Sequence, residues 1–327
     1  MPLALVSLIN AANAAEPSIR AMEGFLLKGN GLSALEIATQ AEAQGSPSPE
    51  VEYATCVKNR LTTDPELSTT LEPFVAELVL LYQRYWRESF LNSNDKSERE
   101  STLLNGIQSL LAVKRGGSFD STERQLSRQL SRRGYFVLTG TTPPFRELML
   151  WKQQTAKVFQ VALPERNQSA KVYLLDEFKS FGWAAWSTCD RRATGGWATD
   201  KALYAPLPRY KSGTTGSDFQ AVFLAHEAQH LADKRRFKDL QPWELEYRAK
   251  LTELWAADDA VMTDRLAKFH ESQSEDPALA HPYANKAILT NLRSYLSVAP
   301  ADARPEEVRR ISKALLESDS KRRNPNE

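Results

Sequence analysis

The sequence predicts a mostly helical α+β protein. Apolar residues recur at helical spacing through the first third of the chain, short runs rich in β-branched and aromatic residues follow Gly134, and long helical segments follow Gly216. The chain has 327 residues, of which 42% are hydrophobic and 25% charged, which is enough for two domains or one large one. We therefore expect a helical N-terminal region followed by a unit with a small sheet and long helices.

The charge balance argues against two classes of partner. The formal net charge is +1, so no global excess of charge points to nucleic acid or to an anionic membrane. No apolar run approaches the ~20 residues that a membrane-spanning helix needs. We expect neither a nucleic-acid partner nor a membrane span, and the composition does not indicate an oligomeric state.

The first fifteen residues, MPLALVSLINAANAA, have two interpretations. Residues 2–9 are apolar and Ala-Asn-Ala-Ala at 12–15 is typical of a cleavage site, but no Lys or Arg precedes Arg20. A signal peptide that lacks its true start would send the protein to the periplasm or outside the cell, whereas an ordinary first helix would leave it in the cytoplasm. We favour export. Cys56 and Cys189 could pair in an oxidising compartment or remain two buried thiols, so they leave the compartment open.

Residues 16–125 are expected to form the helical region. Helices are predicted at residues 32–43, 51–61, 66–92 (beginning properly at Pro73), 97–113 and 121–133. The last of these carries a row of arginines: Arg124, Arg128, Arg132 and Arg133. A basic patch for an acidic partner is one interpretation, but a solvated helix face is the one we favour.

The second domain is expected to cover residues 126–317, with the boundary between 115 and 133. Strands are predicted at residues 135–138, 148–151, 158–163 and 171–175, with edge-type segments at 195–199 and 202–205. After residue 216 the chain reads as helical through residue 269. Residues 318–327 are charged and are predicted to be a disordered tail.

The stretch AVFLAHEAQHLADKRRF, residues 221–237, carries the candidate chemistry. A helix over 219–236 places His226 and His230 one turn apart on an apolar face, so that both imidazoles can reach one ion. Glu227 follows the first histidine directly. In this H-E-x-x-H arrangement the histidines hold Zn²⁺, the ion lowers the pKa of a water toward ~7, and the glutamate takes its proton as general base.

A catalytic zinc site needs a third protein ligand. Pro242 begins a second predicted helix, on which Glu246, Ala249 and Glu253 share one face. The two glutamates lie about 10 Å apart along the helix axis, so only one of them can bind the ion. The other could support a histidine or pair with an arginine such as Arg248. Asp233 is predicted to support a ligand or to pair with an arginine.

These two motifs, H-E-x-x-H on one helix and E-x-x-A on the next, resemble the gluzincin group of zinc metallopeptidases. The resemblance implies a zincin-like fold in which Glu246 is the third metal ligand beside His226 and His230. It also implies that Glu227 is the catalytic residue. The stretch "GGWAT…LYA…FLAHEAQHLAD…LEYRAKLTEL" is also similar to a bacterial family built around the same motif. The resemblance covers residues 135–270, and no transition-state His or Tyr follows at a known spacing.

The predicted function is therefore zinc-dependent hydrolysis of a peptide or protein substrate. One alternative is a helical scaffold or binding protein whose metal site is structural or vestigial, and another is a metal-dependent hydrolase of a non-peptide substrate. His270 and His281 are predicted to be surface histidines, although either could turn toward the cleft. The segments 195–199 and 202–205 are candidates for the edge strand that holds a substrate, or for a plain loop.

Overall fold

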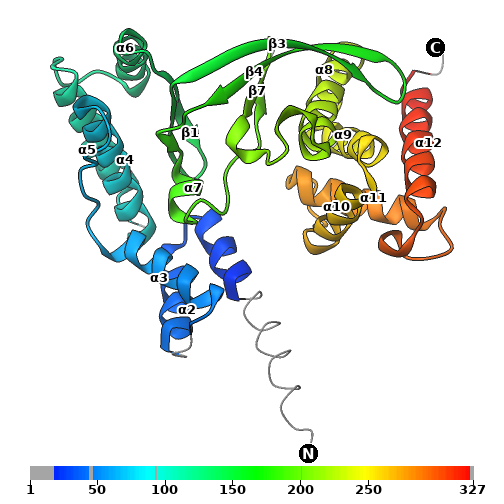
Figure 1. Ribbon diagram of the computed structural model, residues 1–327, viewed down its shortest axis with the longest axis horizontal. Helices are drawn as coiled ribbons and strands as arrows, with labels where there is room; N and C mark the ends of the chain where they lie inside the picture. Colours follow the sequence, from blue (N-terminus) through cyan, green and yellow to red (C-terminus); the bar gives the residue numbers. More distant parts are fainter. Residues whose placement is uncertain (1–17, 44–46, 93, 200, 325–327) are drawn as a thin grey trace, which may run out of the picture. The chain divides into compact units, whose positions relative to one another are not determined.

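The computed structural model describes residues 18–43, 47–92, 94–199 and 201–324, which form two compact units (Figure 1). The first unit comprises Met1–Gln153 with Glu177–Thr194, and the second comprises Gln154–Asp176 with Gly195–Glu327. Helices predominate and the sheets are small, which confirms the mostly α, α+β class. The predicted signal segment lies outside the described residues. Within the described part, no helix has the length and apolar character needed to cross a bilayer.

Five helices of the first unit, α2 to α6, form where the apolar periodicity predicts them, and two others, residues 18–27 and α7, were not predicted. They are residues 18–27, α2 (Gly31–Ala43), α3 (Pro49–Thr62), α4 (Pro73–Leu91), α5 (Lys96–Leu110), α6 (Phe119–Arg132) and the short α7 (Trp183–Ser187). Helix α4 begins at Pro73 because a proline in the first turn sacrifices no intrahelical hydrogen bond. The side chain of Ser48 caps α3 by accepting a hydrogen bond from the Val51 amide.

A three-stranded sheet belongs to this helical unit. Its order is β1 (Phe136–Thr142), β2 (Phe145–Trp151) and β5 (Ser180–Phe181), and β1 and β2 form an antiparallel hairpin. Leu148 and Leu150 of β2 are buried in one core with Trp86 of α4, whose indole N–H donates to the carbonyl of Arg146 at 2.8 Å. The division into units therefore differs from the boundary predicted between 115 and 133, because the hairpin packs on the helices that precede it.

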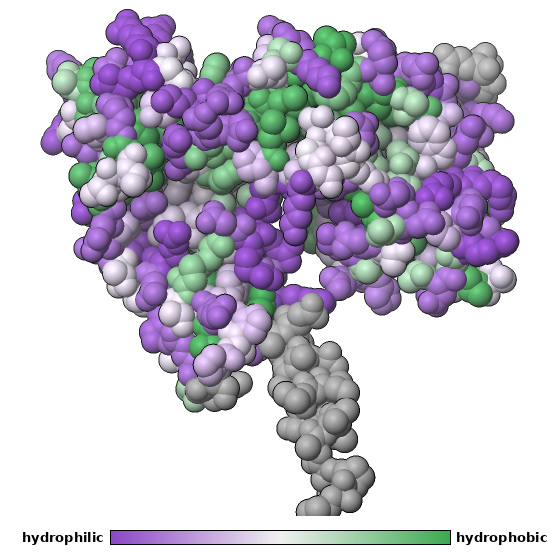
Figure 2. Space-filling model, in the orientation of Figure 1, coloured by the Kyte–Doolittle hydropathy of each residue, from purple (hydrophilic) through white to green (hydrophobic). Residues whose placement is uncertain are grey.

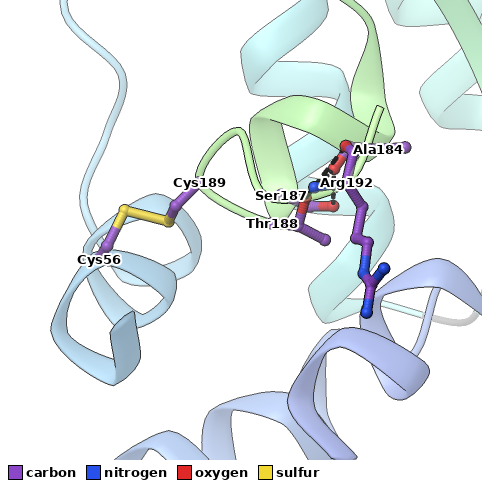
Figure 3. Close-up of a disulfide and its surroundings, with 6 residues drawn as sticks. All are labelled: Cys56, Ala184, Ser187, Thr188, Cys189 and Arg192. Carbon is purple, nitrogen blue, oxygen red and sulfur yellow. Dashed lines mark hydrogen bonds between the residues drawn. A yellow bond between two sulfur atoms is a disulfide. The ribbon is translucent and has the colours of Figure 1, made fainter. Parts of the chain in front are cut away.

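A disulfide joins Cys56 of α3 to Cys189, which follows α7 (Figure 3). The loop after Cys189 is also held by charge, since Glu23 is buried and pairs with Arg191 at 2.7 Å and with Arg192 at 2.5 Å. Thr188 stabilises the same turn by accepting a hydrogen bond from the Arg192 amide at 3.0 Å. Of the two alternatives that the sequence leaves open for the cysteines, the structure has the paired form.

The second unit contains a four-stranded sheet followed by five α-helices. The sheet order is β3 (Gln153–Ala162), β4 (Asn167–Asp176), β7 (Leu203–Pro206) and β6 (Trp197–Ala198). The helices are α8 (His226–Arg236), α9 (Pro242–Ala256), α10 (Asp259–Glu271), α11 (Ala280–Arg293) and α12 (Pro305–Arg323). Strands β4 and β7 are parallel, because between them the chain leaves this unit to build β5 and α7.

The prediction of a disordered C-terminal tail is wrong for residues 318–323, which continue α12. Composition suggested a solvated segment because it is rich in charge. In the structure Asp319 and Ser320 are buried against α9, where Arg248 binds them, so tertiary contacts order the last turns of the helix.

Charged and polar side chains cover most of the visible face of each unit (Figure 2), as amphipathic helices require.

Candidate metal centre

The segment that leads into the histidine pair is a π-helix. It spans Asp218–Ala225, and the α-helix α8 begins only at His226, so the single α-helix predicted for 219–236 is wrong in its first half. Phe219 and Phe223 are buried there against Tyr210, with ring centroids 5.1 and 6.0 Å from it. The spacing of apolar residues does not distinguish an α-helix from a π-helix here, because either helix would bury the two phenylalanine rings. Helical π turns recur at functional sites.

The α-helical geometry from His226 onward brings the two imidazoles together. Both rings are buried, and the Nε2 atoms of His226 and His230 lie 3.0 Å apart. The rings meet edge to face, with centroids 4.6 Å apart and planes at 87°. Residues four apart on an α-helix stand one above the other, which is why this spacing aims both nitrogens at one point.

Glu246 of α9 supplies a carboxylate at the same point. Helix α9 begins at Pro242, as predicted, and its first turn carries a capping box formed by Gln241 and Glu244. One oxygen of Glu246, Oε1, lies 3.3 Å from His230 Nε2, and the other, Oε2, lies 3.6 Å from His226 Nε2. Among the described residues, His226, His230 and Glu246 form the group of ligand-type side chains whose donor atoms all lie within 4.8 Å of one another.

Glu253 lies on the other side of the His226 ring. Its Oε1 is 2.5 Å from His226 Nδ1, and its Oε2 accepts a hydrogen bond from Arg265 Nε at 2.8 Å. A neutral imidazole that donates from Nδ1 presents a lone pair at Nε2, which is the form that binds a metal. Arg248 was the arginine expected beside the second glutamate, but Arg265 of α10 takes that place.

The charges of this cluster favour a cation between the donor atoms. Burial by itself lowers the pKa of His226, but the carboxylates of Glu253, Glu246 and Glu227 outweigh burial and raise it. Burial likewise opposes ionisation of Glu246, yet the histidines beside it, His230, His281 and His226, hold its pKa far below the usual range. The carboxylate is therefore ionised, and the site stabilises positive charge beside it.

Glu227 and His230 complete the neighbourhood of the site. Glu227 is half-buried, and its negative charge adds to the effects of burial and of Asp218 in raising the pKa of Tyr210. His230 Nδ1 is buried without a hydrogen-bond partner among the described residues. The two histidines thus differ, because only His226 has a carboxylate that fixes its tautomer.

A buried ionic network holds α8 against α9 next to the site. Arg248 is fully buried and donates to Asp233 of α8 at 2.9 Å and to Asp319 of α12 at 2.7 Å. Asp233 also accepts a hydrogen bond from Gln229 at 2.9 Å, and Thr252 donates to Gln229 at 3.0 Å. Asp233 thus has the arginine partner that its position suggested, and this partner is Arg248.

Replacing Arg248 with methionine is expected to lower the free energy of unfolding by about 3–5 kcal/mol, because buried carboxylates lose their counter-charge. Chemical unfolding followed by circular dichroism measures this cost. The matched control is Arg310→Met on the exposed side of α12, which should change stability by less than about 0.5 kcal/mol. Equal effects of the two variants would show that the network adds nothing specific.

His281 lies beside the cluster, which the sequence left open as an alternative but did not favour. His270 and His281 are both exposed, as expected, but His281 Nδ1 lies 2.9 Å from Glu246 Oε2. His281 belongs to the first turn of α11, and α11 packs along α9. No sequence signal reports that packing, because the two helices are separated by α10 along the chain.

An edge strand lies near the π-helix that leads into the histidine pair. Of the two candidate segments, the first contains β6, which forms the edge of the sheet, whereas β7 lies inside it between β4 and β6. Gly196, directly before β6, has φ of +150°, and a Cβ on it would approach the Phe223 ring to 2.3 Å. Glycine is therefore required there, because strand and helix approach so closely.

The structure brings together most of the residues that the sequence motifs predict for the site. Glu227, His226, His230 and Glu246 were all predicted from two short motifs, and the structure brings the last three within reach of one ion. Sequence reasoning missed Arg265 and gave His281 a place near the cleft only as the less favoured alternative; both come from helices further along the chain. Comparison with protein-family models, with curated proteins and with solved structures finds no match to this chain.

Proposed function

We propose that this chain is a zinc-dependent metallopeptidase. The observation that carries the proposal is the convergence of two imidazole Nε2 atoms and one ionised carboxylate, with Glu227 next to the first histidine. Two neutral imidazoles and one carboxylate are a set of three protein ligands typical of catalytic zinc, with a further position open for water. The ligands are His226, His230 and Glu246.

The chemistry follows from where the carboxylates lie. A zinc ion held by His226, His230 and Glu246 would supply Lewis-acid chemistry, which lowers the pKa of water toward ~7. Glu227 accepts the proton of the attacking water and returns it to the leaving nitrogen, as a general base and then a general acid. Glu253 keeps His226 in the tautomer that presents Nε2, and Arg265 holds Glu253 in its ionised form.

The edge strand β6 supports a peptide as the substrate. An extended peptide can add to a sheet edge through main-chain hydrogen bonds, which are independent of its side chains. Strand β6 lies at one edge of its sheet, and Gly196 before it packs against Phe223 of the π-helix that leads into α8. This placement favours peptide hydrolysis over the alternative of a non-peptide substrate.

The disulfide supports an oxidising compartment. Disulfides persist in the periplasm and outside the cell and are rare in the cytosol. The pair Cys56–Cys189, together with the apolar and Ala-rich start of the sequence, therefore favours a periplasmic or secreted protein.

The protein is expected to purify with close to one zinc ion per chain, and the double variant His226→Ala/His230→Ala is expected to lack it. Metal analysis by mass spectrometry measures this, with His270→Ala as the matched control. The zinc-loaded protein should cleave casein, and a chelator should stop cleavage until zinc is restored. Full zinc occupancy in the double variant would refute the site, and a loaded protein that leaves casein and a peptide library intact would refute the peptidase.

A further inference from the structure

The side chain of His281 reaches Glu246 from a third helix. Its Nδ1 lies 2.9 Å from Glu246 Oε2, and Glu246 is the carboxylate nearest to both Nε2 atoms of the histidine pair. The His281 side chain is 67% exposed, whereas that of Glu246 is only 13% exposed. A solvent-facing imidazole thus meets a mostly buried carboxylate.

The two oxygens of Glu246 have different neighbours. Oε1 lies 3.3 Å from His230 Nε2, while Oε2 lies 2.9 Å from His281 Nδ1 and 3.6 Å from His226 Nε2. A carboxylate can accept a hydrogen bond on one oxygen and bind a cation through the other. Oε2 is buried and has no hydrogen-bond partner of standard geometry among the described residues, although His281 Nδ1 lies within reach of it.

His281 itself lies outside the group of metal ligands. The donor atoms within 4.8 Å of one another come from His226, His230 and Glu246, and those of His281 are not among them. Its contact is with one oxygen of one ligand, as expected for a residue that orients a ligand. Glu253 makes the equivalent contact with His226 on the far side of that ring.

We propose that His281 is a positioning residue for Glu246. Its Nδ1 lies close enough to Oε2 to supply the hydrogen bond that this buried oxygen lacks among the described residues, and so to hold the Glu246 carboxylate in place. This inference rests on the proposed metal site but does not depend on what the enzyme cleaves. Two ligands are then each oriented from another helix: His226 of α8 by Glu253 of α9, and Glu246 of α9 by His281 of α11.

The test is the zinc affinity of purified His281 variants, measured by competition with a chromophoric chelator. His281→Ala should bind zinc about 10-fold to 100-fold more weakly, the usual cost of removing a group that orients a ligand. His281→Asn should recover most of the affinity, because its amide nitrogen occupies nearly the place of Nδ1 and can donate the same hydrogen bond. His270→Ala, which changes another exposed histidine, should bind zinc as the unaltered protein does.

Two results would overturn the inference. Unchanged affinity in His281→Ala would show that the contact is incidental, and equal losses in His281→Ala and His281→Asn would show that hydrogen-bond donation is not its role. Glu246→Ala, measured alongside, separates this inference from the site itself. If Glu246→Ala binds zinc normally, the proposed site and the inference both fail; if it loses zinc while His281→Ala keeps it, the inference alone fails.

Discussion

Glu227→Gln is expected to lower the turnover of peptide substrates by about 10²–10⁴-fold, the usual contribution of a general base. Glutamine has nearly the same shape as glutamate but cannot accept a proton from water at neutral pH. Zinc content should stay unchanged, because Glu227 is not among the side chains that converge on one ion. The measurement pairs kcat from peptide cleavage with metal analysis of the same sample.

The control for this variant is Glu306→Gln, which makes the same chemical change at an exposed position of α12. It should leave both turnover and zinc content as they are. A Glu227→Gln protein that holds zinc and retains full turnover would show that Glu227 is not the base. Loss of zinc together with turnover would instead assign Glu227 to the support of the metal.

Glu246→Ala is expected to weaken zinc binding by more than about 100-fold, and Glu253→Ala by only about 10-fold to 100-fold. The reason is geometric. Glu246 faces the Nε2 atoms of both histidines, whereas Glu253 faces Nδ1 of His226, so the His226 ring separates Glu253 from the ion. Ala249 is fully buried one turn after Glu246. Its side chain is a single methyl group and adds little bulk to α9, which packs against α8.

The zinc dissociation constants of both variants are measured by chelator competition, with the unfolding of the metal-free forms as a check on folding. Glu253→Gln is the matched control, because its amide oxygen can still accept the hydrogen bond from His226 Nδ1 and should recover part of the affinity. If Glu253→Ala removes zinc and Glu246→Ala retains it, the two roles are exchanged.

The local elements could be predicted because their signals are local. Apolar spacing and the prolines at 73 and 242 predict α2 to α6 and α9 to within a few residues, whereas residues 18–27, α7, α11 and α12 were not predicted. The strand-like runs from residue 135 onward all contain strands. The histidine pair of the candidate site could also be predicted, because residues one helical turn apart share a face, as His226 and His230 do.

Errors arose where packing between distant segments decided the outcome. The π-helix of 218–225 and the α-helix predicted there bury the same phenylalanines, so the pattern does not distinguish them. The high charge of residues 318–323 led to the prediction of disorder. In the structure Asp319 is held by Arg248, which lies 71 residues earlier in the chain. The hairpin of β1 and β2 joins the helical unit because its apolar face packs on α4, not because of its place in the sequence.

The sequence by itself determined which side chains could form a metal site, namely His226, His230, Glu227 and a glutamate of the next helix, because covalent spacing along a helix sets which residues share a face. The sequence favoured Glu246 over Glu253, both by the resemblance and because Glu246 lies in the early turns of the helix that Pro242 begins. Only the tertiary structure decided which glutamate lies at the Nε2 atoms and which lies at Nδ1, and that Arg265 and His281 stand beside them. The physical reason is that the offset between packed helices depends on contacts among all their side chains, such as those of the buried Arg248, and no short motif encodes that sum.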